Sequence, residues 1–287
     1  MNLSNDQVIH QVKDGVEFLQ FRRLLDFQDK LTHAYSLGIN VNYRTAKPNK
    51  EPLSGQEYQV RKNDYDALSK AIGWETKQIV KTNQEHTDEI KIVKQKEKRD
   101  EPDWNLNTYH QTDGLITNQK NMLLATTNAD CLLLLFYDPV TNTIANVHSG
   151  WRGTIQKIAE KTVEKMKKQF NCQAENIICC LSPSIRMCHF EVGEEVKNNF
   201  VHEFKRWADP KNWLVEVKAE SNEQRKIPKW KIDTAKLNTM MLEKQGLKTE
   251  NIIDCGICSM CHSDQIHSYR VEKQEYGLET ALIGMKR

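Results

Sequence analysis

The middle of the chain carries hydrophobic runs of the length of β-strands. Apolar or β-branched residues dominate 122–127, 132–137 and 143–147, and the string Asp-Pro-Val-Thr-Asn at 138–142 has the composition of a turn. These runs predict one strand followed by a β-hairpin.

Helical spacing begins after the third run. From Thr154 onward apolar side chains recur every three or four residues, with lysines and glutamates opposite, which predicts an amphipathic helix. Asp233 is placed to cap a further helix that ends near Gly246. The other elements predicted in this half are a strand at 177–181, a helix within 191–204, and strands at 252–254 and 281–284.

The first hundred residues are less regular. The first 30 residues fit either a pair of strands or a short helix, and the polar stretch 44–63 predicts a loop. Asn63 and Asp64 are placed to cap a helix that ends at Gly73. Further along, the predictions are short strands at 79–81 and 90–93 and a charged connector at 94–105.

Strands and helices alternate irregularly along the chain, and no repeat is visible. This pattern favours an α+β fold in which mixed β-sheets are flanked by helices. We expect residues 1–287 to form a single domain.

Charge and apolar content narrow the classes of function. The chain has 41 basic and 39 acidic residues, a net charge of +2, and so gives no electrostatic reason to bind nucleic acid. Its most apolar run, 131–137, is far shorter than the roughly 20 residues of a transmembrane helix, and the N-terminus lacks the apolar segment of a secretory signal. We therefore expect a cytoplasmic protein without a membrane partner, whose eight cysteines are reduced.

The string Asn-Val-His-Ser-Gly-Trp-Arg-Gly-Thr at 146–154 joins a predicted strand to a predicted helix. Gly150 and Gly153 permit a tight turn and close approach of a ligand, and Arg152 adds a permanent charge beside the unpaired first amides of the helix. The turn suits an anion such as phosphate. Any strand-to-helix joint can also need glycines, so a purely structural role stays open.

His148 ends one strand of the predicted hairpin, and Cys131 precedes the other. The register expected for a loop at 138–142 places the two residues opposite each other to within one position. A neighbouring thiol and imidazole can be a nucleophile with its base, two metal ligands, or two core residues.

The motifs, taken as an ordered set, resemble those of the YfiH/laccase-domain family, formerly called multicopper polyphenol oxidases. The set is QEH at 84–86, DGLIT at 113–117, NADC at 128–131, HSGWRG at 148–153, LSPSIRMCHFEVGEEV at 181–196 and SYR at 268–270. The resemblance is clearest over 60–287, and the ordered set is far more specific than any one motif.

The resemblance implies a zinc ion held by His86, Cys131 and His148. One thiolate and two imidazoles leave a fourth position open, as in catalytic zinc sites. Copper could bind the same ligands, but a laccase activity is not expected. A laccase needs several copper centres and more clustered histidines than the nine scattered ones in this chain.

The implied activities are phosphorolysis of adenosine, inosine, guanosine or methylthioadenosine, and hydrolytic deamination of adenosine. The substrates are then a small nucleoside and phosphate. The residues expected to be catalytic are Cys131, His148 and Arg152, and those expected to bind phosphate or substrate are Gly150, Arg152, Gly153 and Arg270.

Two other functions fit the same residues. Cys131 as nucleophile and His148 as base would make an amidase or hydrolase, and family members are also associated with editing peptidoglycan precursors. A binding protein without activity is the third alternative, because two substrate arginines of the family are missing. The family's Ser-Thr-Arg is replaced by His33-Ala-Tyr-Ser36, and its Arg-Arg and Thr-Gly-Arg by Arg270-Val271 and Tyr276-Gly277-Leu278.

Cys255, Cys258 and Cys261, followed by His262, have the spacing of zinc or iron–sulfur ligands. No second, distant Cys-x-x-Cys completes the set, which favours packing or a local thiol pair over a metal. The remaining cysteines, Cys172, Cys179, Cys180 and Cys188, are predicted to fill space beside strands, although Cys188 lies in a motif near a ligand loop.

Overall fold

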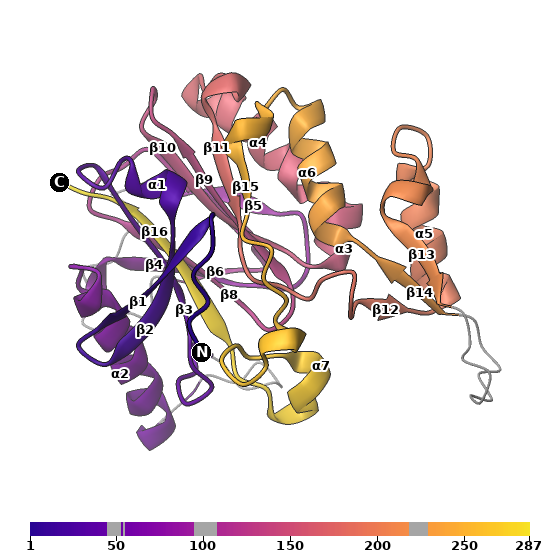
Figure 1. Cartoon of the computed structure of the whole chain (residues 1–287). Helices are drawn as coiled ribbons and strands as arrows, with labels where there is room; N and C mark the ends of the chain where they lie inside the picture. Colours follow the sequence, from indigo (N-terminus) through magenta and orange to yellow (C-terminus); the bar gives the residue numbers. More distant parts are fainter. Residues whose placement is uncertain (45–52, 54, 95–107, 218–228) are drawn as a thin grey trace.

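The computed structural model describes residues 1–44, 53, 55–94, 108–217 and 229–287 (Figure 1). Two large sheets pack face to face, and helices cover their outer faces. The prediction of an α+β fold with mixed sheets and flanking helices is confirmed. None of the helices in the described ranges is long and apolar enough to cross a membrane.

The larger sheet has seven strands and combines both pairing directions. From edge to edge its order is β1 (Val8–Lys13), β2 (Val16–Phe21), β3 (Leu31–Ser36), β16 (Glu279–Met285), β8 (Leu123–Asn128), β4 (Ile79–Asn83) and β6 (Thr108–His110). The first five strands pair antiparallel, whereas β4 runs parallel to both β8 and β6.

The second sheet has six strands and carries the predicted hairpin at its centre. Its order is β15 (Ile252–Asp254), β11 (Ile178–Leu181), β9 (Leu132–Asp138), β10 (Thr143–Ser149), β7 (Gly114–Thr117) and β5 (Ile90–Ile92). Strand β9 is apolar from Leu132 to Phe136, because both its faces are buried. Leu133 and Leu135 face the core between the two sheets, whereas Leu134 and Phe136 face helices α4 (Ile158–Phe170) and α6 (Thr234–Lys244).

The predicted helix after Thr154 begins earlier and is divided. Helix α3 (Trp151–Ile155) starts directly after Gly150, and Lys157, with a φ of 61°, separates it from α4. Asp233 caps α6 as predicted, because its side chain accepts a hydrogen bond from the amide of Lys236.

A small third sheet stands at one end of the molecule together with α5 (Glu194–Phe204) (Figure 1). Its strands are β12 (Glu191–Val192), β14 (Lys229–Ile232) and β13 (Leu214–Val217). The helix predicted within 191–204 therefore starts later, because residues 191–192 pair with β14 before Gly193 caps the helix.

For the first 30 residues the sequence left a strand pair and a short helix open. The structure has the strand pair, β1 and β2, and a short helix, α1 (Arg22–Leu25), after it. The loop predicted at 44–63 is wrong for its second half, because α2 (Gly55–Ala71) begins eight residues before Asn63. Its first turns are mostly polar and exposed, so they show no apolar period. The buried residues that pack on the seven-stranded sheet, Tyr65, Leu68 and Ala71, come later in the helix. The predicted connector at 94–105 lies outside the described residues except for Lys94.

The remaining elements are short. They are α7 (Tyr269–Glu272) and 3₁₀ turns at Thr76–Gln78, Ala174–Asn176, Pro210–Asn212, Thr249–Asn251, Met260–His262 and Lys273–Glu275. That residues 1–287 form one domain stays a prediction.

Candidate active site

His86, Cys131 and His148 meet at the wall of a cavity of about 490 Å³. Their ligand atoms all lie within 4.8 Å of one another. The Sγ atom of Cys131 is 3.8 Å from Nε2 of His86, and the two imidazole rings are perpendicular with centroids 4.9 Å apart. The structure therefore brings together three residues that 62 positions of sequence separate.

Cys131 reaches His148 by a different register from the one predicted. The hairpin loop is one residue shorter, because Asp138 and Thr143 form the last pair of the ladder, and this sets His148 opposite Leu133. Cys131 lies just before β9, beyond the pair formed by Leu132 and Ser149. The predicted register is thus wrong by one position, and Cys131 lies two positions before the partner of His148, although the side chains still converge.

Gly150 makes room for this convergence. A Cβ atom at this position would lie 2.8 Å from Cδ2 of His86, 3.2 Å from Sγ of Cys131 and 3.3 Å from Cε1 of His148. Any side chain there would collide with His86, so the glycine is needed for the three ligands to meet. Gly150 is itself buried, and its expected contact with phosphate stays a prediction.

Asp113 fixes both histidines. Its carboxylate accepts hydrogen bonds from the amides of Glu85, His86 and Thr87 and from the Thr87 hydroxyl, which shapes the loop that carries His86. It also lies 2.8 Å from Nδ1 of His148. A proton on Nδ1 directs Nε2 of His148 toward a metal, as in carboxylate–histidine–zinc arrangements.

The charges of these groups are strongly coupled. Burial works to raise the pKa of Cys131, but the charge and hydrogen bonds of His148 and His86 outweigh it and lower this pKa to about 6. Burial likewise opposes the charged form of His148, yet Cys131 and Asp113 raise its pKa to about 10. Despite burial, the hydrogen bonds and charge of His148 and Thr87 lower the pKa of Asp113 to about 2. With no metal bound, Cys131 and His148 therefore favour a thiolate–imidazolium pair at neutral pH, and a metal that bound to Nε2 of His148 would displace its proton.

Three arginines line the same cavity: Arg44, Arg152 and Arg270. Arg152 is exposed and stacks over Trp151 at 4.2 Å. Arg270 donates to the carbonyl of Glu191, and Arg44 donates to the carbonyl of Tyr276 while its guanidinium lies 4.2 Å from the centre of that residue's ring. The cavity thus places three permanent positive charges near the thiolate.

The anion site expected at the start of the helix stays a prediction. Helix α3 has five residues, which gives a weak dipole, so Arg152 would supply most of the attraction for an anion. Gly153 is buried against the carbonyl of Thr87 and is not among the residues that line the cavity. Its role toward phosphate stays a prediction.

Sequence reasoning missed two residues of the site. Asp113 stands within the motif DGLIT, and its position before a strand and next to a glycine was the available signal. Arg44 had no signal, because the loop that carries it reaches the cavity through contacts with distant residues. The amide of Tyr43 donates to the carbonyl of Leu278, 235 positions away in the sequence.

The cysteines outside the cavity separate into two groups. Cys172, Cys179 and Cys180 are buried as predicted. Cys255 is also buried, 3.5 Å from Nη2 of Arg186. The prediction that Cys188 fills space is wrong, because its side chain is exposed and lies next to Cys258 and Cys261.

The fold and the cavity define a mixed α/β protein with three convergent metal-ligand side chains beside a cluster of arginines. The chain belongs to the family described as multi-copper polyphenol oxidoreductase laccase, whose model matches residues 49–286. The resemblance seen in the motifs is thereby confirmed.

Relatives and solved structures agree with this membership. The chain is 24% identical over 255 residues to mouse purine nucleoside phosphorylase LACC1, covering 86% of the chain and 51% of the relative. It is 32% identical over 161 residues to a purine nucleoside phosphorylase of Bacteroides thetaiotaomicron, covering 56% of each. The matched regions thus span about half the length of these relatives.

Among solved structures, the Bacillus licheniformis hypothetical protein YfiH superposes with a TM-score of 0.76 at 21% identity, covering 94% of this chain and 96% of that one. YlmD from Geobacillus stearothermophilus gives a TM-score of 0.71 at 20% identity, covering 89% and 93%. At these identities the likeness shows the shared fold.

Proposed function

We propose that this protein is a zinc-dependent purine nucleoside enzyme that catalyses phosphorolysis of nucleosides and deamination of adenosine. The observation that supports this most is the meeting, in one cavity, of His86, Cys131 and His148 with three arginines. Two family relatives carry the name purine nucleoside phosphorylase, which agrees with the proposal.

The donor set favours zinc. One thiolate and two imidazoles match the ligands of catalytic zinc sites and leave a fourth position open toward the cavity. Zinc bound there would supply a water of lowered pKa and a Lewis acid. Asp113 would hold His148 in the tautomer that presents Nε2 to the metal, and Gly150 keeps the space between the ligands free.

The arginines would bind phosphate and orient it. Guanidinium groups bind phosphate through paired hydrogen bonds. Of the three arginines, Arg152 is the exposed one, and it follows strand β10, which carries His148. Arg270 is held by Glu191 and the ring of Phe190, and Arg44 by Tyr276. The side chain of Arg44 therefore offers the cavity a guanidinium in a chain that lacks two substrate arginines of the family motifs.

Aromatic side chains would receive the flat base. Trp151, Phe190, Tyr269 and Tyr276 line the cavity. Tyr269 and Tyr276 meet edge to face with their ring centres 5.2 Å apart. Stacking on such rings recognises a purine by its shape and leaves its edge to polar groups.

The direct test supplies adenosine with and without phosphate to the purified protein and separates the products by chromatography. We expect adenine and ribose 1-phosphate only when phosphate is present, and inosine by deamination in its absence. Binding of adenosine without either product would favour the alternative of a binding protein.

A second function is supported by the same geometry. Cys131, His148 and Asp113 form the order of nucleophile, base and orienting carboxylate found in cysteine hydrolases. In that case the protein would be an amidase or hydrolase, for example one that edits peptidoglycan precursors. Exhaustive chelation separates the alternatives, because a cysteine hydrolase keeps its activity without metal. A cytoplasmic location, the expected setting for reduced cysteines, remains part of the proposal.

A further inference from the structure

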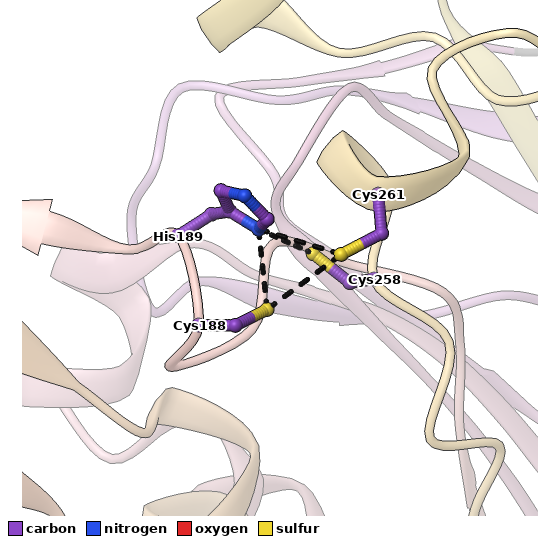
Figure 2. A group of neighbouring side chains, drawn as sticks. All are labelled: Cys188, His189, Cys258 and Cys261. Atoms are coloured by element: carbon purple, nitrogen blue, oxygen red, sulfur yellow. Dashed lines mark hydrogen bonds between the residues drawn. The ribbon is translucent and has the colours of Figure 1, made fainter.

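A second group of metal-ligand side chains lies outside the cavity. Cys188 and His189 follow β11 and its loop, and Cys258 and Cys261 follow β15. Figure 2 shows the three sulfur atoms and the imidazole pointing toward one another. All four ligand atoms lie within 4.8 Å of one another.

The spacing of the donors matches a single tetrahedral ion. With Zn–S near 2.3 Å and Zn–N near 2.0 Å, tetrahedral geometry requires sulfur atoms about 3.8 Å apart and nitrogen–sulfur distances of about 3.5 Å. Nδ1 of His189 lies 3.2 Å from Sγ of Cys188, 3.6 Å from that of Cys258 and 3.5 Å from that of Cys261. Sγ of Cys188 and Sγ of Cys261 are 3.9 Å apart.

The backbone holds the two ligand segments in register. Ser184 forms an isolated parallel bridge with Cys258, in which the Ser184 amide donates to the carbonyl of Ile257 and the Ser259 amide donates to the carbonyl of Ser184. The amides of Arg186 and Cys261 form hydrogen bonds with the Cys258 thiol. Amide donors to a sulfur stabilise its thiolate, the form in which cysteine binds metal.

We propose that Cys188, His189, Cys258 and Cys261 bind one structural zinc ion that ties the loop after β11 to the segment after β15. Three thiolates and one imidazole give a closed tetrahedral site, since no coordination position is left for substrate. An iron–sulfur cluster is larger than one ion and would need donors that are farther apart than these.

Such an ion would brace one wall of the cavity. Phe190, next to His189, lines that wall, and so does Arg270. Asp130, next to Cys131, accepts hydrogen bonds from the Ser259 hydroxyl at 2.6 Å and from the Arg270 amide at 2.8 Å. The zinc-bound segment is therefore joined to the residue that precedes Cys131.

The experiment counts zinc in the full-length protein after removal of the cavity ligands. The double variant His86→Ala, Cys131→Ser should retain about one zinc per chain. X-ray absorption of that zinc should show three sulfur atoms near 2.3 Å and one nitrogen near 2.0 Å. Adding Cys188→Ser and Cys261→Ser should lower the zinc content to zero.

His262→Ala is the matched control, because His262 is adjacent to Cys261 in the sequence but does not belong to the group. It should keep its zinc. The proposal would be overturned if zinc persisted in the variant that carries all four substitutions. It would also be overturned if the His86→Ala, Cys131→Ser variant held no zinc. If the proposed function fails instead, the wild type holds a single zinc that Cys131→Ser leaves in place.

The wild-type protein gives a second readout that needs no variant. Cys188 and Cys261 are exposed, so an alkylating reagent can reach both sulfur atoms when no metal is bound to them. Bound zinc should protect both until a chelator removes it. Rapid alkylation of the protein as purified, or a disulfide between the two residues in unreduced protein, would also overturn the proposal.

Discussion

The two groups of cysteine and histidine in this molecule use the same residue types in opposite settings. His86, Cys131 and His148 provide three donors at the wall of a cavity that also holds three arginines. The group of Cys188, His189, Cys258 and Cys261 provides four donors, two of them on exposed cysteines. Three ligands leave a position for chemistry, whereas four complete the coordination and stabilise the fold.

The contacts that support the donor atoms also differ between the two groups. Asp113 orients His148 and the loop of His86, so the first group depends on a buried carboxylate. In the second group the Cys258 sulfur receives backbone amides instead. Ligand number and supporting contacts together would therefore distinguish the proposed reactive metal centre from the proposed structural one.

The largest expected effect is on turnover and comes from removing one proposed ligand of the cavity group. Cys131→Ser should lower nucleoside turnover by at least about a hundredfold, because it removes a metal ligand of the cavity. Zinc at the four-ligand group should remain. Cys172→Ser is the control, since Cys172 is buried away from both groups beside Thr141. Undiminished turnover in the Cys131 variant would contradict the assignment.

The next effect tests the carboxylate that only the first group has. Asp113→Asn should weaken zinc binding at the cavity by about 10- to 100-fold, because the amide no longer fixes His148 in its metal-binding tautomer. Competition with a chromophoric chelator measures this affinity, and Glu89→Gln, an exposed change, serves as control. An unchanged affinity would mean that Asp113 only shapes the loop.

A smaller effect tests the charge beside the metal centre. Arg152→Ala should raise the KM for phosphate by tenfold or more, since a charge-assisted contact contributes about 1.5–3 kcal/mol. Deamination, which uses no phosphate, should change less. Steady-state kinetics of both reactions measure the difference, and Arg206→Ala, an exposed arginine on another surface, is the control. Equal losses in the two reactions would assign Arg152 a structural role.

Acid would release metal from both proposed sites, so acid unfolding of the protein itself is tested on metal-free protein. Burial lowers the pKa of His33 to about 3, and Nε2 of its ring accepts a hydrogen bond from the Phe21 amide. A depressed folded-state pKa gives stability that is present above the unfolded value of about 6.5 and is lost as pH falls toward 3.

His33→Gln keeps an acceptor for that amide but cannot titrate. Between pH 6.5 and 5.5 the wild type should therefore lose on the order of 1 kcal/mol more stability than the variant. Urea unfolding of metal-free protein at the two pH values measures this difference. Parallel losses in both proteins would show that His33 does not control the acid response.

Local patterns were sufficient for the centre of the fold. The apolar run of β9, the turn after it and the capping Asp233 each depend on neighbours in sequence, and each was predicted. The first half of α2 was not, because its exposed residues need no apolar period. The register of the hairpin was missed by one residue of loop length, which local composition does not determine.

The candidate site likewise contains residues that the sequence motifs predicted and residues that they did not. The proposed metal ligands of the cavity stand in motifs that could be matched as an ordered set, whereas Arg44 enters through a loop whose position depends on the distant residues Tyr276 and Leu278. The spacing of Cys255, Cys258 and Cys261 suited a metal, but the sequence favoured packing or a local thiol pair. The structure joins only two of these to Cys188 and His189, because the packing of two distant loops selects the partners.

The most direct measurement maps alkylation of Cys131 by mass spectrometry before and after chelation, with adenosine turnover followed in parallel. If zinc is bound by His86, Cys131 and His148, iodoacetamide should leave Cys131 unmodified in the metal-loaded protein, and chelation should abolish turnover and expose the thiolate together. Rapid labelling of Cys131 in metal-loaded protein, or full activity without metal, would contradict the zinc mechanism and establish Cys131 as a nucleophile.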